Sequence, residues 1–148
     1  LHERQKDRNQ AVVIMQRVLE VNDQNATALN YIGYTYAEKG IKLDEAEKLV
    51  TKALVLRPND GFITDSVGWV YFKQRKFDLS LKALEKALEL APDEPTILYH
   101  LGEVYLSRSE REKALRYFER ARKAWEIKEE KDEEELQKIL ERIQLLSL

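Results

Sequence analysis

The chain has 148 residues, of which 43% are hydrophobic and 35% charged, and its formal net charge is −2. This composition is too apolar for a disordered chain, and the length suits one domain with its own core. The nearly balanced charge gives no general attraction to a phosphate backbone, so no nucleic-acid binding is expected. Because the chain has no cysteine, disulfides and thiolate chemistry are excluded. Its apolar runs are too short for a membrane span, so no membrane insertion is expected.

The first predicted element is a helix over residues 3–22. Four of its apolar residues have an apolar counterpart 35 positions later in the sequence. Ala11, Met15, Val18 and Leu19 correspond to Ala46, Val50, Ala53 and Leu54. We therefore interpret residues 3–22 as the second helix of a repeat unit whose first helix is missing. Because the sequence also starts at Leu1 rather than at a methionine, we expect it to be a piece of a longer protein.

From residue 26 onward the sequence repeats itself. Gly33, Gly68 and Gly102 are separated by 35 and 34 residues, and each is followed three residues later by a tyrosine. Small residues and prolines recur in the same register: Ala46, Ser80 and Ala114, then Pro58 and Pro92. The period predicts three units, over residues 26–60, 61–94 and 95–128. The one extra residue of the first unit is expected in the turn Gly40-Ile41-Lys42.

Each unit is predicted to be a hairpin of two helices. Small residues such as the three glycines belong where helix axes approach closely, and apolar residues at helical spacing surround them. Each proline, followed by acidic or amide residues, ends one hairpin and opens the next helix. Since a single hairpin cannot bury its faces alone, the units must stack on one another.

Residues 129–148 form the last predicted element. An acidic run is followed by apolar residues at helical spacing, namely Leu136, Ile139, Leu140, Ile143 and Leu146. This pattern predicts an amphipathic helix. Its apolar face either caps the last repeat or pairs across a two-fold axis in a homodimer, and both interpretations remain open.

The Gly-x-x-Tyr, alanine and proline positions at this spacing resemble the tetratricopeptide repeat (TPR). Ser80, Thr64 and Glu126 depart from the usual TPR pattern. The resemblance implies an all-α solenoid of helix hairpins wound into a right-handed superhelix, with the first helix of each unit lining a concave groove. Residues 65–69 also resemble a variant found in bacterial TPR proteins. This favours a bacterial source and the cell envelope or periplasm, with the cytoplasm as the alternative compartment.

The groove implied by this resemblance is the candidate binding site for a protein or peptide ligand. Residues of the first helices that point away from the hairpin core form the candidate set: Asn30, Tyr31, Tyr34, Phe62, Asp65, Trp69, Phe72, Tyr99, His100 and Glu103. The aromatic members offer large apolar contact area, with Trp69 at the centre. Asn30, Asp65, His100 and Glu103 are expected at the rim, where the carboxylates suit a ligand with a Lys or Arg.

On these grounds the predicted function is a protein–protein interaction scaffold or adaptor. The basic and amide clamp with which some TPR domains hold the acidic tail of heat-shock chaperones is lacking here. The alternative function is a structural module that self-associates through its terminal helices, as a homo-oligomer.

The sequence shows no pattern that indicates catalysis, so no enzyme activity is expected. The two histidines, His2 and His100, lack a partner at metal-ligand spacing, and neither a metal nor a cofactor is expected. The glycines are isolated and form no phosphate loop, and the serines lack a nucleophile motif. Basic residues between Arg108 and Lys123 alternate with glutamates, which is typical of a solvated helix face; a surface for an acidic or nucleic-acid partner is the alternative interpretation.

Overall fold

The computed structural model describes residues 2–148, with side chains from Lys6 onward. Within this range the chain forms eight α-helices and no strand, so the prediction of an all-α fold is confirmed. The helices in chain order are α1 (His2–Val21), α2 (Ala26–Lys39), α3 (Leu43–Leu56), α4 (Gly61–Lys73), α5 (Phe77–Leu90), α6 (Pro95–Ser107), α7 (Arg111–Glu126) and α8 (Glu133–Leu146).

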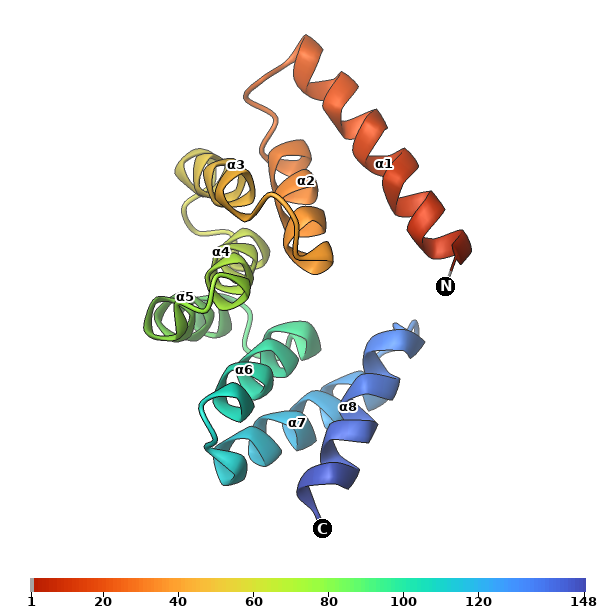
Figure 1. Ribbon diagram of the computed structural model, residues 1–148, viewed down its shortest axis with the longest axis vertical. Helices are drawn as coiled ribbons and strands as arrows, with labels where there is room; N and C mark the ends of the chain where they lie inside the picture. Colours follow the sequence, from red (N-terminus) through yellow and green to blue (C-terminus); the bar gives the residue numbers. More distant parts are fainter. Residues whose placement is uncertain (1) are drawn as a thin grey trace.

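The helices form a curved stack of antiparallel hairpins, with α2/α3, α4/α5 and α6/α7 as successive pairs (Figure 1). Helix α1 packs on α2 in the same way that α3 packs on α4 and α5 on α6. Helix α8 folds back from the end of α7, and α1 and α8 face each other across the hollow side of the stack (Figure 1).

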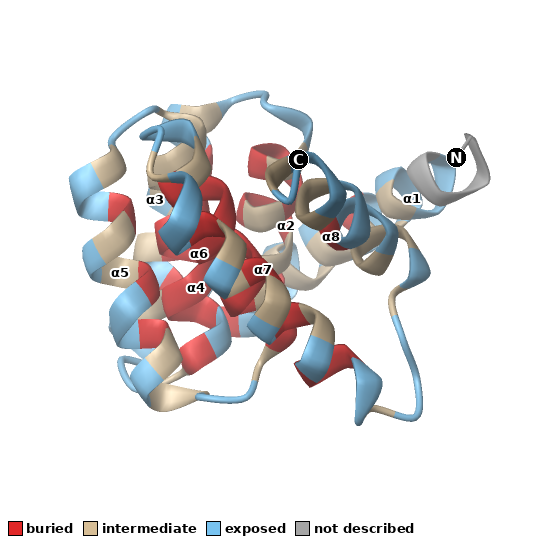
Figure 2. Ribbon diagram, turned by 90° about the horizontal axis from the view of Figure 1, so that it is seen from below, coloured by how far each residue is buried: buried red, intermediate tan, exposed pale blue. Residues whose placement is uncertain are grey.

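The first helix of each hairpin is buried more completely than the second. Helices α4 and α6 are buried over most of their length, whereas α3 and α5 each bury only one stripe of residues (Figure 2). The first helices are more buried because they lie between the second helices and the inner surface of the solenoid. Fully buried Leu84 and Phe118 anchor the later hairpins, and such side chains each contribute roughly 1.5 to 3 kcal/mol.

The close approach inside each hairpin depends on a glycine in the first helix. A Cβ placed on Gly102 would lie 2.5 Å from Cε1 of Phe118, and one on Gly68 would lie 2.7 Å from Cδ2 of Leu84. Real carbon contacts are about 3.5 to 4.0 Å. A larger residue at either position would therefore push the two helices of the hairpin apart.

The turn inside each hairpin has the same backbone geometry. One or two residues after the first helix comes a residue in the left-handed region, which is Gly40, Arg75 or Ser109, with φ of 66°, 63° and 62°. The N–H of the next residue then donates to the carbonyl of the repeat tyrosine, as Ile41 does to Tyr36. The first hairpin holds one more residue between Gly40 and the following helix than the others do, so the extra residue lies within the Ile41–Lys42 segment.

Side chains at the helix starts provide specific caps. The Asn25 side chain accepts a hydrogen bond from the Ala28 N–H at 2.9 Å, and Asp60 accepts from Phe62 and Ile63. Asp132 accepts from the Glu135 N–H and fixes the start of α8. Each cap satisfies N–H groups that the first helical turn leaves without a partner.

Helix α8 covers the end of the solenoid. Its Ile139 is fully buried against α7, next to Trp125, and Ile143 and Leu146 pack on the same cluster. Part of its apolar surface stays outside this contact, since Leu140 is 41% exposed and Leu145 48% exposed. Among the described residues, no helix is long and apolar enough to cross a bilayer.

Candidate functional site

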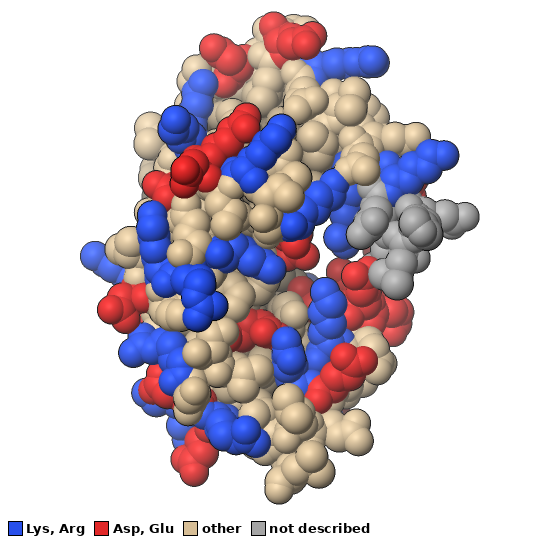
Figure 3. All heavy atoms as spheres, viewed as in Figure 1, with Lys and Arg blue, Asp and Glu red and all other residues tan. Residues whose placement is uncertain are grey.

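The hollow side of the solenoid contains a groove with a volume of about 810 Å³. Helices α2, α4 and α6 form its floor, α8 forms one wall, and Arg8 of α1 lies at its edge. The space-filling view shows the molecule hollowed at this place, with charged side chains gathered around the opening (Figure 3). None of the residues that line it comes from α3, α5 or α7, the outer helices of the hairpins.

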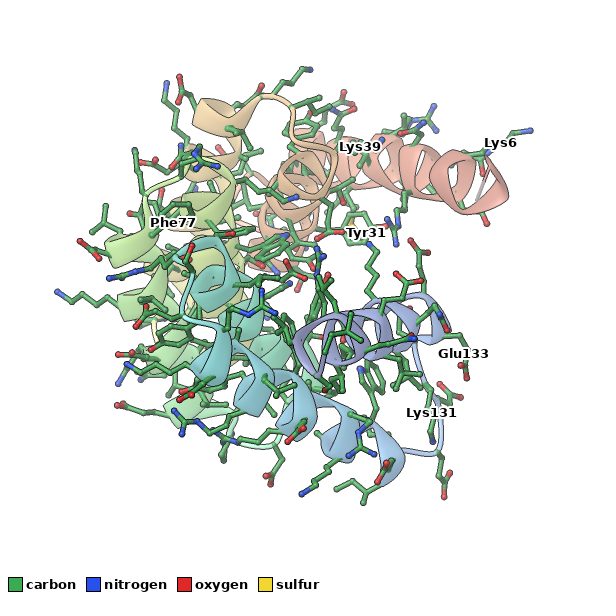
Figure 4. All side chains as sticks on the ribbon, turned by 60° about the horizontal axis from the view of Figure 1, so that its bottom comes forward. Lys6, Tyr31, Lys39, Phe77, Lys131 and Glu133 are labelled. Atoms are coloured by element: carbon green, nitrogen blue, oxygen red, sulfur yellow. The ribbon has the colours of Figure 1, made fainter. Side chains whose placement is uncertain are left out.

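Nine of the ten predicted site residues line this groove, and His100 lies directly behind its surface. They are brought together because the same helix face recurs in each hairpin. Phe62 is 58% exposed at the groove mouth, whereas Tyr31, Tyr34 and Phe72 are partly buried. Figure 4 shows Tyr31 in the space between α2 and α8, with Phe77 on the opposite, outer side of the molecule.

Trp69 is part of the wall rather than an open contact surface. Only 4% of it is exposed, and its ring stacks on Phe72 at 4.7 Å and on His100 at 3.8 Å between centroids. Its indole N–H donates to Oε1 of Glu38 at 2.6 Å. Removing this side chain would open a cavity, which costs about 3 to 5 kcal/mol for a buried Trp, so its main role in the free protein is packing.

Asp65 and His100 form a buried pair beneath the aromatic floor. Nδ1 of His100 lies 2.7 Å from Oδ1 of Asp65, and Nε2 lies 3.4 Å from the Tyr34 hydroxyl. Burial disfavours the charged imidazole, but the charge and hydrogen bond of Asp65 more than offset it, and the pKa of His100 is raised. Burial, with the charges of Glu38 and Asp65, raises the pKa of Tyr34 well above its usual value.

The expectation that Asp65, His100 and Glu103 stand at the rim is therefore wrong. Their exposed fractions are 5%, 1% and 7%, because each is engaged by a neighbouring helix. The pairing could have been foreseen, since Asp65 and His100 occupy neighbouring first helices and point inward. A carboxylate and an imidazole meeting inside a fold satisfy each other, as buried polar groups must.

Helix α8 contributes the groove wall that the sequence did not reveal. Arg142 donates to Glu103 at 2.8 Å and 3.3 Å through two of its nitrogens, and Glu135 accepts from Thr96 and from the Trp125 indole. Burial is the main reason that the pKa of Glu135 is raised. The acidic start of α8 was visible in the sequence, but nothing in the repeat pattern indicated that it turns toward the groove.

The groove lining is rich in carboxylates. From Lys6 onward, eight of its residues are acidic and four are Lys or Arg: Glu38, Asp65, Glu94, Glu103, Asp132, Glu134, Glu135 and Glu141 against Arg8, Lys73, Lys138 and Arg142. Among the residues whose side chains are described, no group of three or more His, Asp or Glu is arranged to hold a metal ion. His2 lies outside the residues with described side chains.

Comparison with known proteins agrees with the repeat architecture. Residues 68–126 match the family model described as tetratricopeptide repeat. A TPR repeat-containing protein of Pseudomonas aeruginosa is 38% identical over 76 residues, which are 51% of this chain and 13% of that protein. The chain thus spans only a small part of the length of this relative, whose bacterial origin fits the source suggested by residues 65–69.

Solved structures share the fold at low sequence identity. The translocator chaperone SycD of Yersinia enterocolitica type III secretion superposes with a TM-score of 0.74 at 19% identity, covering 86% of this chain and 96% of that chain. SycD in complex with a peptide of the translocator YopD gives 0.68 at 18% identity, covering 80% and 89%.

A third structure, the first TPR of Spaghetti (RPAP3) bound to an HSP90 peptide, gives a TM-score of 0.65 at 22% identity, covering 84% of this chain and 95% of that chain. The repeated glycines and tyrosines, the stacked hairpins and these matches lead to one conclusion. The chain is an all-α solenoid of the tetratricopeptide-repeat type, and its residues 68–126 match the tetratricopeptide-repeat model.

Proposed function

We propose that this chain is a non-catalytic protein-interaction module that holds a peptide or helical segment of a partner protein in its groove. The observation that carries the proposal is a groove of about 810 Å³ whose accessible aromatic side chains, Phe62, Tyr31 and Phe72, come from successive first helices. Such side chains bury large areas with little loss of conformational entropy. Two solenoids of similar fold hold peptides, one from YopD and one from HSP90.

The experiment that tests this proposal is selection of short random peptides on the folded chain, followed by affinity measurement by fluorescence polarisation. The test variant is Tyr31→Ala/Phe62→Ala, because these residues lie in the groove and are not fully buried. Loss of two aromatic contacts is expected to weaken binding by about tenfold or more. The matched control is Leu79→Ala, which removes a 49% exposed apolar side chain from the outer helix α5.

Equal affinities of the wild type and the groove variant, both folded by circular dichroism, would contradict groove binding. Trp69→Ala is unsuitable as the main test, because the buried ring supports the floor and its loss would change folding as well as binding.

A second candidate function is self-association, and one face of α1 favours it. In the first hairpin, Gly33 of α2 packs against Ala46, Leu49 and Val50 of α3. The equivalent residues of α1, 35 positions earlier, are Ala11, Ile14 and Met15.

Met15 packs partly against the neighbouring core, whereas Ile14 is 57% exposed. A second copy could bury it, and one form of SycD was crystallised as an alternative dimer. Sedimentation over a range from micromolar to millimolar, with Ile14→Glu as the test variant and Leu79→Glu as the control, separates the outcomes. A wild type that stays monomeric throughout contradicts self-association.

A further inference from the structure

Two carboxylates of the groove lining, Glu38 and Glu135, each accept a hydrogen bond from a tryptophan. The chain has two tryptophans, and both donate their indole N–H to a groove carboxylate. Trp69 donates to Glu38 at 2.6 Å on the α2/α4 side, and Trp125 donates to Glu135 at 2.9 Å on the α7/α8 side. Neutral indoles thus hold two carboxylates in fixed positions without neutralising their charge.

Neither carboxylate has a cationic partner among the described residues. On Glu38 the hydrogen bond uses Oε1, and on Glu135 both hydrogen bonds, from Thr96 and Trp125, use Oε2. Both glutamates line the groove, and Glu38 also interacts with the hydroxyl of Tyr34, which carries no charge. The side-chain oxygen of Asn30, which lines the same groove, is buried and accepts no hydrogen bond.

None of the four described cations of the groove lining forms an ion pair with Glu38 or Glu135, and Arg8 lies only at the edge of the groove. Arg142 is engaged by Glu103, and the ammonium of Lys73 lies 5.2 Å above the ring of Trp69. Lys138, one turn after Glu135 on α8, is exposed and forms no ion pair with a described residue. The carboxylates of Glu38 and Glu135 are thus left as charges in a partly water-excluded space, where an opposite charge is worth more than at an open surface.

Both charges act on the same aromatic floor. Burial is the main cause of the raised pKa of Tyr34 and of Tyr99, and the charges of Glu38 and Glu135 add to it in each case. Burial lowers the pKa of His100, but Asp65 raises it, and the charges of Glu135 and Glu38 add a smaller effect in the same direction. The floor between α2 and α8 is therefore a region of negative potential bordered by tyrosine rings.

We propose that this groove recognises a basic segment of a partner protein and that an arginine or lysine side chain of that segment inserts between Glu38 and Glu135. The proposal rests on the groove-binding function above and names the chemistry of its ligand. A guanidinium or ammonium group brings only donors, which matches the two carboxylates, whose oxygens are acceptors. The tyrosine rings favour the same group through their π faces and pack against its aliphatic stem.

The test begins with the peptides selected on the wild-type chain, which are expected to be enriched in arginine or lysine. One such peptide is then compared with versions in which the arginine is replaced by lysine or by uncharged, isosteric citrulline. Citrulline is expected to weaken binding by about tenfold. If the lysine peptide binds as tightly as the arginine peptide, the site recognises the positive charge alone. If the lysine peptide binds more weakly, the guanidinium donors also contribute. Either result supports the proposal.

The matched variants replace charge and keep shape. Glu38→Gln/Glu135→Gln retains an acceptor for each indole N–H and is expected to remove the preference for arginine over citrulline. Glu89→Gln, on the outer helix α5 with a side chain that is 73% exposed, is expected to leave it unchanged. Because the chain has two indole N–H groups, each bound to one of the carboxylates, their two NMR resonances report occupancy directly.

The two proposals fail in different ways. Arginine and citrulline peptides of equal affinity, or a preference that survives in the double variant, would overturn the basic-ligand proposal and leave groove binding intact. Selected peptides without basic residues would do the same. If the Tyr31→Ala/Phe62→Ala variant binds the peptides with the affinity of the wild type, both proposals, groove binding and a basic ligand, are overturned.

Discussion

Replacing Gly102 by alanine tests whether close helix approach holds the hairpins together. The new Cβ would lie 2.5, 2.7 and 2.9 Å from three ring carbons of Phe118, whose side chain is fully buried. To reach a normal contact of about 3.5 Å, the ring or the helix must move by roughly 1 Å. Such overpacking costs about 1 to 3 kcal/mol, and the better helix propensity of alanine returns up to about 1 kcal/mol.

We therefore expect Gly102→Ala to lower the free energy of unfolding by about 1 to 2 kcal/mol. The measurement is urea unfolding followed by circular dichroism, with the dependence on urea compared between variants, since repeat proteins can lose two-state behaviour. In a double-mutant cycle, Phe118→Leu provides space for the new methyl group, so the two changes together should cost less than their sum. A Gly102→Ala protein as stable as the wild type would refute the steric explanation for the repeat glycine.

Three further changes have distinct expected outcomes. Since Asp65 raises the pKa of His100 above its unfolded value of about 6.5, the pair stabilises the fold fully below that pH and loses its contribution as the pH rises through the folded pKa. Urea unfolding at stepped pH should show this decline in the wild type and a flatter profile in Asp65→Asn; equal slopes would contradict it. Ser109→Gly relieves a left-handed residue in a turn where the first hairpin already has Gly40, and should raise the free energy of unfolding by up to about 1 kcal/mol. A lower melting temperature would argue against strain at this turn. Ile139→Ala should cost about 2 to 5 kcal/mol and speed amide hydrogen exchange in α8, whereas unchanged exchange would show that this contact does not hold the helix.

The helix hairpins were predictable because the same physical requirement appears in each one. A glycine at a close helix crossing and a tyrosine one turn later recur at nearly constant spacing, so a single interpretation had to explain Gly33, Gly68 and Gly102 together. The inner faces of α2, α4 and α6 followed from the same register. This is why nine of the ten predicted site residues line the groove.

The remaining features depend on contacts that the repeat does not encode. The position of α8 comes from the packing of Ile139 and from the ion pair between Arg142 and Glu103, which joins residues 39 positions apart. The burial of Asp65 and His100 likewise depends on how two neighbouring first helices are offset. A hydrophobic period identifies the face of a helix but not the depth at which a polar side chain on that face comes to lie.

The placement of α8 makes it both the end cap of the solenoid and a wall of the groove. A ligand that contacts this wall must stabilise the docked position of α8, and by reciprocity whatever loosens α8 must weaken that ligand by the same free energy. Local unfolding of α8 would then compete with ligand binding, so any change that alters the stability of α8 would also alter the affinity. Protection of the α8 amides against hydrogen exchange would become a measure of groove occupancy even for a ligand that never touches the outer hairpin helices.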